Sequence, residues 1–217
     1  MHQGYWALLI IAVFLLLMFI ANYMYMRLNF ASEISRKVLH VGGGVITFIM
    51  PAVFTSHVWV LLLCGLCMVL LIITYLQKKF GAVHKTKRPS IGSLLFPIPV
   101  YFCFLLYEKT GSGLLFYIPI AILTFADTAA EISGTTLGRS SKKIIHNKTW
   151  AGSLAFAVTA FTAASVCCFL KMNMLPANII LVCFVIAIAT TIAEAVTDNG
   201  WDNLTIPFTA AALLFFV

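Results

Sequence analysis

Two carboxylates four residues apart are the side chains of this sequence that most clearly point to chemistry. Asp127 and Glu131 lie within an apolar stretch, and on a helix this spacing places one side chain above the other on one face. Stacked acids in a low-dielectric setting repel unless one is protonated or a cation bridges them. Mg²⁺ is the natural cation, because it takes one or two carboxylates and completes its shell with phosphate oxygens and water. The alternative is a pair of acids neutralised by Arg139 or Lys148 across a helix interface.

A glycine-rich and basic segment follows the two acids. Gly134 and Gly138 continue their stripe along the helix, and Lys148, Thr149 and Gly152 then open the next apolar run. Free N–H groups at a helix start, together with a hydroxyl and a lysine, form a site suited to phosphate. The string is short and is not a P-loop. The basic loop before it is equally typical of a solvated loop on the positive side of a membrane.

Two further groups of polar residues lie at the ends of other apolar runs. Arg36 and His40 share a helix face with Lys37 beside them, so His40 is a candidate proton acceptor or phosphate ligand. The alternative is a buried, hydrogen-bonded histidine. Near the C-terminus, Glu194 precedes Asp202-Asn203, where Asn203 is also a plausible helix N-cap.

The composition predicts the scaffold that must position these groups. Of 217 residues, 62% are hydrophobic and 10% charged, which a soluble domain of this size could not bury. We therefore expect a single all-α domain over residues 1–217, a polytopic membrane helical bundle with seven spans and a short C-terminal eighth. The apolar runs cover about 5–26, 35–54, 58–76, 93–107, 114–137, 152–170, 176–197 and 204–217.

Some local features refine this scaffold. Pro97 and Pro99 predict a bent or partly unwound fourth helix. The N-terminal run is too long for a signal-peptide core, so we expect a retained helix. All six cysteines, including the Cys64-x-x-Cys67 pair, fall in apolar runs, which favours buried packing over zinc or redox chemistry.

The basic residues predict an orientation. The net charge is +7, but the charges sit in short loops between apolar runs, which indicates topology and not nucleic-acid binding. An outside N-terminus leaves only Lys109 and Lys171 outside and places twelve of the fourteen basic residues in the cytoplasm: Arg27, Arg36, Lys37, Lys78, Lys79, Lys85, Lys87, Arg88, Arg139, Lys142, Lys143 and Lys148. All the acidic residues except Glu108 fall on the same, cytoplasmic side. Since acids contribute little to orientation, their grouping indicates an active site on the cytoplasmic side.

These stretches together resemble the CTP-dependent polyprenol kinase family, which includes dolichol, phytol and farnesol kinases and a yeast-type diacylglycerol kinase. The matching residues, in the expected order, are Arg36-Lys37-x-x-His40-x-x-x-Gly44, Ala126-Asp127-x-x-Ala130, Gly134, Gly138-Arg139, Lys148-Thr149-x-x-Gly152, Glu194 and Asp202-Asn203-Leu204-x-x-Pro207. The chain departs from the family at Ala126, where Gly is common, and at Thr149 and Ala151 of a segment that commonly reads Lys-Ser-x-Glu-Gly.

The resemblance implies transfer of the γ-phosphate of CTP to the hydroxyl of a membrane lipid alcohol, with Mg²⁺. We expect the metal at Asp127, Glu131 and Asp202, and catalytic roles for His40, Lys37, Asp127, Lys148 and Glu194. Nucleotide binding is expected at Arg36, Gly134, Gly138, Arg139, Lys148, Thr149, Gly152 and Asn203.

Partners would be CTP, the lipid alcohol and membrane lipids, with a homo-oligomer left open. Two alternatives are a phosphatidate cytidylyltransferase-like enzyme, which is a more distant resemblance, and a proton- or cation-coupled transporter. A transporter would place its acids nearer the midplane.

Overall fold

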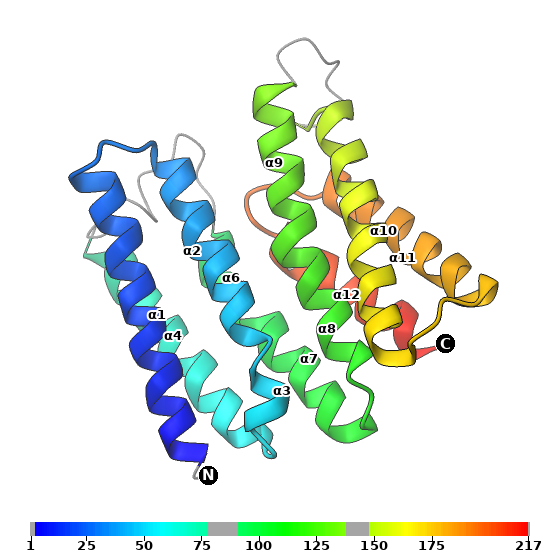
Figure 1. Cartoon of the computed structure of the whole chain (residues 1–217). Helices are drawn as coiled ribbons and strands as arrows, with labels where there is room; N and C mark the ends of the chain where they lie inside the picture. The colour runs from blue at the N-terminus through cyan, green and yellow to red at the C-terminus, as the bar shows by residue number, and fades with distance from the viewer. Residues whose placement is uncertain (1–2, 78–90, 138–147, 217) are drawn as a thin grey trace.

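The fold is a bundle of helices, shown by a computed structural model that describes residues 3–77, 91–137 and 148–216 (Figure 1). Within these ranges there is no strand. The helices are α1 (Gln3–Met26), α2 (Ser32–Thr47), α3 (Met50–Val53), α4 (His57–Leu76), α6 (Gly92–Leu95), α7 (Pro97–Thr110), α8 (Leu114–Ala121), α9 (Asp127–Thr136), α10 (Trp150–Met172), α11 (Ala177–Val196) and α12 (Asp202–Phe215). A π-helical segment, η1 (Ile122–Ala126), joins α8 to α9.

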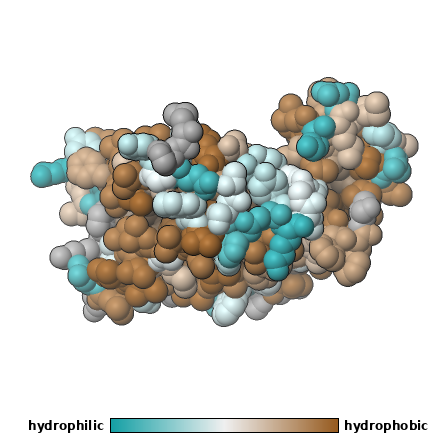
Figure 2. Space-filling view, turned by 90° about the horizontal axis from the view of Figure 1, so that it is seen from below, coloured by the Kyte–Doolittle hydropathy of each residue, from teal (hydrophilic) through white to brown (hydrophobic). Residues whose placement is uncertain are grey.

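The bundle presents apolar side chains outward, as a membrane protein does. Among the described residues, five helical stretches are long and apolar enough to cross a bilayer, namely α1, α4, the continuous Leu114–Thr136 stretch, α10 and α11. Large apolar residues are exposed along them, for example Leu8, Leu62 and Leu181, and hydrophobic surface covers much of the face in Figure 2. The all-α membrane bundle is therefore confirmed. The exact count of spans stays a prediction, because α2 and α7 have only 16 and 14 residues.

Prolines divide the fourth apolar run as the sequence predicts. The run is split into α6 and α7 at Phe96, and Pro97 and Pro99 lie in the first turn of α7. Proline fits a first helical turn because its missing N–H would have no partner there, whereas in a helix interior it removes a hydrogen bond. Phe96 is thereby held beside His40, with ring centroids 5.1 Å apart in an edge-to-face arrangement.

Two buried apolar clusters meet at α8. One gathers residues of α8 to α12 around Phe156 and Ile186, and the other gathers residues of α1, α4, α7 and α8 around Phe104 and Phe116. Figure 1 shows α1, α2 and α4 on one side, α10 and α11 on the other, and the continuous α8–η1–α9 segment between them. The central α8 thus contributes side chains to both apolar clusters. The residues that follow it lie between the two halves of the bundle.

The segment that follows α8 is irregular. Pro119 lies inside α8 and lacks the N–H of a regular turn, and η1 then accommodates one extra residue in a π-helical turn. α2 packs against this segment so closely that a Cβ on Gly44 would overlap the side chain of Thr124. The close approach brings the polar face of α2 onto the first residues of α9.

Candidate active site

The basic start of α2 contacts the acidic face of α9. Arg36 lies 3.1 Å and Lys37 2.9 Å from the same oxygen of Glu131, Oε2. All three side chains are partly buried, so these contacts are less screened than pairs on an open surface. Arg36 and Glu131, which are 95 positions apart in sequence, are therefore in direct contact. Glu131 is shared between two cations and so is charge-compensated.

His40 lies one turn further along α2 and faces η1. Its Nε2 is 3.1 Å from the carbonyl oxygen of Leu123 and 3.9 Å from Oδ2 of Asp127. A carbonyl oxygen can only accept, so Nε2 carries the hydrogen in this contact and donates it. Nδ1 is consequently the ring nitrogen with a free lone pair in the neutral imidazole. If His40 accepts a proton, it does so at Nδ1.

A second charged group joins three segments of the C-terminal half. Lys148 Nζ lies 2.6 Å from Oε1 of Glu194, at the end of α11, and 3.1 Å from Oδ2 of Asp202, at the start of α12. Burial by itself would lower the pKa of Lys148, but the surrounding carboxylates, Asp202 foremost, outweigh it and raise the pKa above its usual range. The ammonium is therefore charged at any physiological pH.

Asp127 lies between the two charged groups. It is close enough to Lys148 and to Asp202 to interact electrostatically with both, and it faces His40 on the other side. The polar residues predicted from three distant stretches of the sequence are thus gathered around Asp127 and Glu131. They are Arg36, Lys37, His40, Lys148, Glu194 and Asp202. The geometry brings the predicted acids and bases into one region of the bundle.

The oxygen donors around Asp127 suit a hard cation. Asp127 and Asp202 are neighbouring carboxylates, and Oε2 of buried Glu194 has no hydrogen-bond partner among the described residues. In residues 3–77, 91–137 and 148–216, no three His, Cys, Asp or Glu side chains form a ready metal cage. Mg²⁺ does not require one, since it uses one or two carboxylates together with substrate phosphates. Glu131, the third predicted metal ligand, differs from Asp127 and Asp202 in its partners, because two basic side chains of α2 already compensate its charge.

The predicted phosphate segment has a helix-capping and packing role. Thr149 is the N-cap of α10, where its hydroxyl accepts a hydrogen bond from the N–H of Gly152 at 3.2 Å. A Cβ on Gly152 would lie 3.0 Å from the carbonyl oxygen of Ala130, and Gly134 faces Thr149 from α9. Gly134 and Gly152 therefore let α9 and α10 approach closely. Gly138 and Arg139 lie outside the described residues.

Asn203 does not have the helix N-cap position that was considered for it above. It is the second residue of α12 and not its N-cap, which is Trp201. Its side-chain amide donates to the carbonyl of Gly200 at 3.4 Å, and the backbone turns sharply there through Asn199 and Gly200, both with positive φ. Oδ1 of Asn203 is buried and has no hydrogen-bond partner in the part of the chain that the structure describes, and the residue lines the pocket next to the charged groups.

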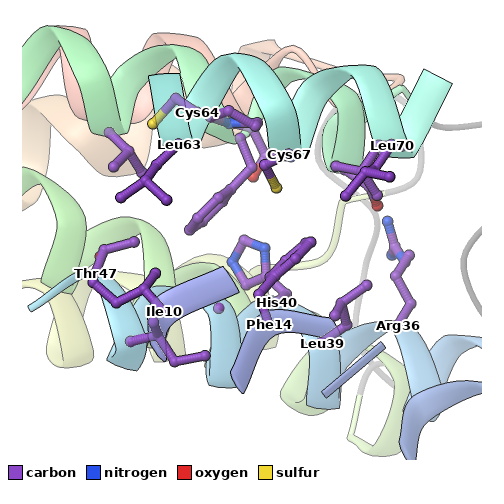
Figure 3. A pocket seen from close by; sticks show the side chains of 18 of the residues that line it. Ile10, Phe14, Arg36, Leu39, His40, Thr47, Leu63, Cys64, Cys67 and Leu70 are labelled. Atoms are coloured by element: carbon purple, nitrogen blue, oxygen red, sulfur yellow. The ribbon is translucent and has the colours of Figure 1, made fainter. Parts of the chain in front are cut away.

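A pocket begins at these charged groups and extends into the apolar interior. Its polar end is lined by Arg36, Lys37, His40, Asp127 and Glu131, and its walls by apolar residues of α1, α2, α4 and α7. Figure 3 shows His40 between the two walls, with Arg36 toward one end of the pocket and Thr47 toward the other. The sequence could not single out the wall residues, because Leu, Ile and Phe on several helices give no signal that distinguishes a pocket from a core.

Comparisons with known proteins give a similarity in sequence. No protein-family model matches the chain, and no solved structure matches it. The chain is similar to a curated phytol kinase from Synechocystis sp., with 23% identity over 185 residues that cover 84% of this chain and 78% of that protein. The chain is thus similar to the polyprenol and phytol kinases over most of its length.

Proposed function

We propose that this chain is a lipid-alcohol kinase that transfers the γ-phosphate of CTP to the hydroxyl of a membrane isoprenoid alcohol of the phytol, farnesol or polyprenol type. The observation that carries the proposal is the pocket with two unlike ends. One end gathers two cations, a histidine and two carboxylates, and the other is apolar. A substrate with a single polar end and a long hydrocarbon chain suits such a pocket, and the similarity to a phytol kinase supports the activity.

The charged groups suit phosphoryl transfer, which depends chiefly on positioning and electrostatic stabilisation. Arg36 and Lys37 lie at the polar end, where they would neutralise phosphate oxygens in competition with Glu131. Lys148 stays cationic and lies near Asp127. Asp127 and Asp202, with Asn203 beside them, would hold Mg²⁺, which when bound neutralises the nucleotide phosphates. Thr149 and Gly152 shape the start of α10 next to these residues.

In the transfer step, the alcohol oxygen attacks the γ-phosphorus and the bond between that phosphorus and the bridging oxygen of CDP breaks. The hydroxyl proton must leave, and His40 lies where the polar and apolar ends of the pocket meet. Its Nδ1 is the acceptor, since Nε2 already donates to the carbonyl of Leu123. Because the basic loops and the acids share one side of the predicted topology, we place this reaction at the cytoplasmic face.

Membranes containing the protein, incubated with CTP labelled at the α- or the γ-phosphate, test the reaction class. The kinase predicts γ-label in the lipid, a cytidylyltransferase predicts α-label, and a transporter predicts neither. Asp127→Asn should remain folded in membranes and lower γ-transfer by about 10³-fold, the upper range for removing one preorganised electrostatic group. Glu108→Gln is the matched control, since Glu108 accepts a hydrogen bond from His57 N far from the site. Wild-type turnover by Asp127→Asn would refute the assignment.

A further inference from the structure

A second apolar pocket lies between the first turns of α1 and α4, and we call it the α1–α4 groove. It is lined by residues within 4–11 of α1 and 59–66 of α4. On its rim, Leu8 and Leu62 are 66% and 60% exposed. On its floor, Ala7 and Leu63 are each 7% exposed. The groove therefore opens on the outer surface of the bundle, where the bilayer would surround it.

The groove adjoins the pocket of the candidate active site. Ile11, Leu63 and Leu66 line both cavities. The charged groups lie toward the opposite end of the bundle, because Arg36 is close to the start of α2 and α2 runs back alongside α1 in the opposite direction (Figure 1). The two cavities thus form one apolar path that begins at the charged groups and reaches the surface at the groove.

Close packing shuts the pocket where α2 meets its neighbours. A Cβ on Gly42 would overlap Leu17 of α1. One on Gly44 would overlap Thr124 of η1. Gly43 between them lines the pocket, and a Cβ on it would meet no atom within 4 Å. The space beside α2 therefore belongs to the pocket, while the contacts of α2 with α1 and η1 leave no room for a lipid chain to pass.

The other contacts of α4 are closed as well. Further along the same two helices, Met18 of α1 and Leu71 of α4 are 4% and 3% exposed and share a buried cluster. Towards α7, Val60 and Cys103 are fully buried in another cluster. In the described part of the chain, the wall of the pocket is thus least closed at the α1–α4 groove.

The groove also lies where α1 can separate from α4. Gln3 Nε2 donates to Thr55 Oγ1 at 2.7 Å, and Thr55 N donates to Gln3 Oε1 at 3.4 Å. Both hydrogen bonds are exposed, so water can replace them at little cost. α1 packs more extensively on α2 than on α4. Parting of α1 from α4 would therefore widen the groove while the contacts between α1 and α2 stay.

We propose that the α1–α4 groove is the lateral opening of the active site, through which a lipid alcohol enters and its hydrocarbon chain extends into the bilayer while its hydroxyl lies near His40. The inference rests on the proposed function for the identity of the lipid and adds the route that the lipid takes. A chain that leaves through the groove is not limited by the length of the pocket. The site then binds the hydroxyl end of the alcohol and leaves the far end of its chain in the bilayer.

A photoreactive lipid tests this route without turnover. The protein in liposomes, without nucleotide, is irradiated with geranylgeraniol that carries a diazirine at the far end of its chain, and mass spectrometry locates the label. We expect label on residues within 4–11 and 59–66 that excess unlabelled geranylgeraniol displaces. α11 lies on the other side of the bundle in Figure 1, and label on its exposed residue Leu181 comes from probe dissolved in the bilayer and should not be displaced. Absence of label in the groove, or label there that is not displaced, would overturn the inference.

A reversible bridge across the groove tests the route during turnover. The double variant Leu8→Cys/Leu62→Cys is bridged in liposomes by a bis-maleimide with a cleavable disulfide linker, and mass spectrometry confirms the bridge. We expect the bridged protein to lose most of its γ-phosphate transfer from CTP to geranylgeraniol and to recover it on reduction, because the bridge holds α1 against α4. Wild-type protein treated in the same way controls for the native cysteines. Undiminished transfer by the bridged protein would contradict the lateral opening.

The photolabel and the transfer assay separate this inference from the proposed function. Displaceable label in the groove without γ-label transfer from CTP would refute the kinase but leave the lateral opening. Transfer without displaceable label in the groove would refute the lateral opening but leave the kinase.

Discussion

Replacing Lys148 with methionine tests whether one ammonium has both a structural and a catalytic role. Lys148 contacts Glu194 at 2.6 Å and Asp202 at 3.1 Å. Methionine keeps an unbranched side chain of similar shape but removes the charge and the N–H donors. The substitution leaves the Glu194 carboxylate, whose side chain is 3% exposed, without its partner.

The magnitude follows from this burial. Removing one partner of a fully buried ion pair costs about 3–5 kcal/mol, because the other charge is left without compensation. Lys148 is 22% exposed, and a carboxylate left alone can take up a proton. We therefore expect Lys148→Met to lower the free energy of unfolding by about 2–3 kcal/mol. The double variant Lys148→Met/Glu194→Gln should recover more than half of that loss, since the unpaired charge is gone.

Denaturant unfolding in lipid–detergent micelles measures the stability, and γ-phosphate transfer from CTP measures the activity. Both variants should have low activity, because the cation near Asp127 is absent from each. Lys171→Met, at an exposed lysine near the end of α10, is the control and should stay within about 0.5 kcal/mol of the wild type. The reasoning fails if Lys148→Met is as stable as the wild type, or if adding Glu194→Gln deepens the loss.

Further variants at the contacts of α2 with η1 and α9 separate packing from chemistry. Glu131→Gln weakens the contact with its two basic partners on α2, so the KM for CTP should fall by a factor of about two to five, as for release of a partly exposed ion pair, with no change in the Mg²⁺ requirement. A higher Mg²⁺ requirement would instead make Glu131 a metal ligand. Gly44→Ala should destabilise the protein by about 1–3 kcal/mol through overlap with Thr124. Thr124→Ala should relieve part of that loss, because it removes Oγ1 and Cγ2 but keeps the Cβ, 2.9 Å from the added Cβ. Gly43→Ala should be neutral or stabilising, and a stable Gly44→Ala protein would contradict the close approach of α2.

The helices were largely predictable because apolar runs of membrane length are a direct signal. The predicted runs at 58–76, 152–170 and 176–197 correspond to α4, α10 and α11 within a few residues. The break near Pro97 and Pro99 also followed from local chemistry, since proline cannot donate the hydrogen bond that a helix interior needs. These features depend on residues close together in sequence.

The partners within the site were less predictable because they depend on how helices pack. Sequence spacing indicated that Asp127 and Glu131 share a helix face, but it could not assign Glu131 to two cations on α2. Lys148 was predicted beside phosphate, and its contacts with Glu194 and Asp202 depend on the turn between α11 and α12. Gly134 and Gly152 face each other across two helices, which neither position alone reveals.

The π-helical segment before Asp127 has an evolutionary consequence. An α-helix turns about 100° per residue, so one inserted or deleted residue rotates everything that follows by that angle. With η1 in place, Asp127 faces His40 and Leu123 offers its carbonyl to the same ring. Loss of one residue from Ile122–Ala126 would turn the acidic face of α9 away from α2 while leaving hydrophobicity and length almost unchanged. A relative could therefore keep every motif and still lose the site through a single-residue gap, which an alignment scored on identity would hardly penalise.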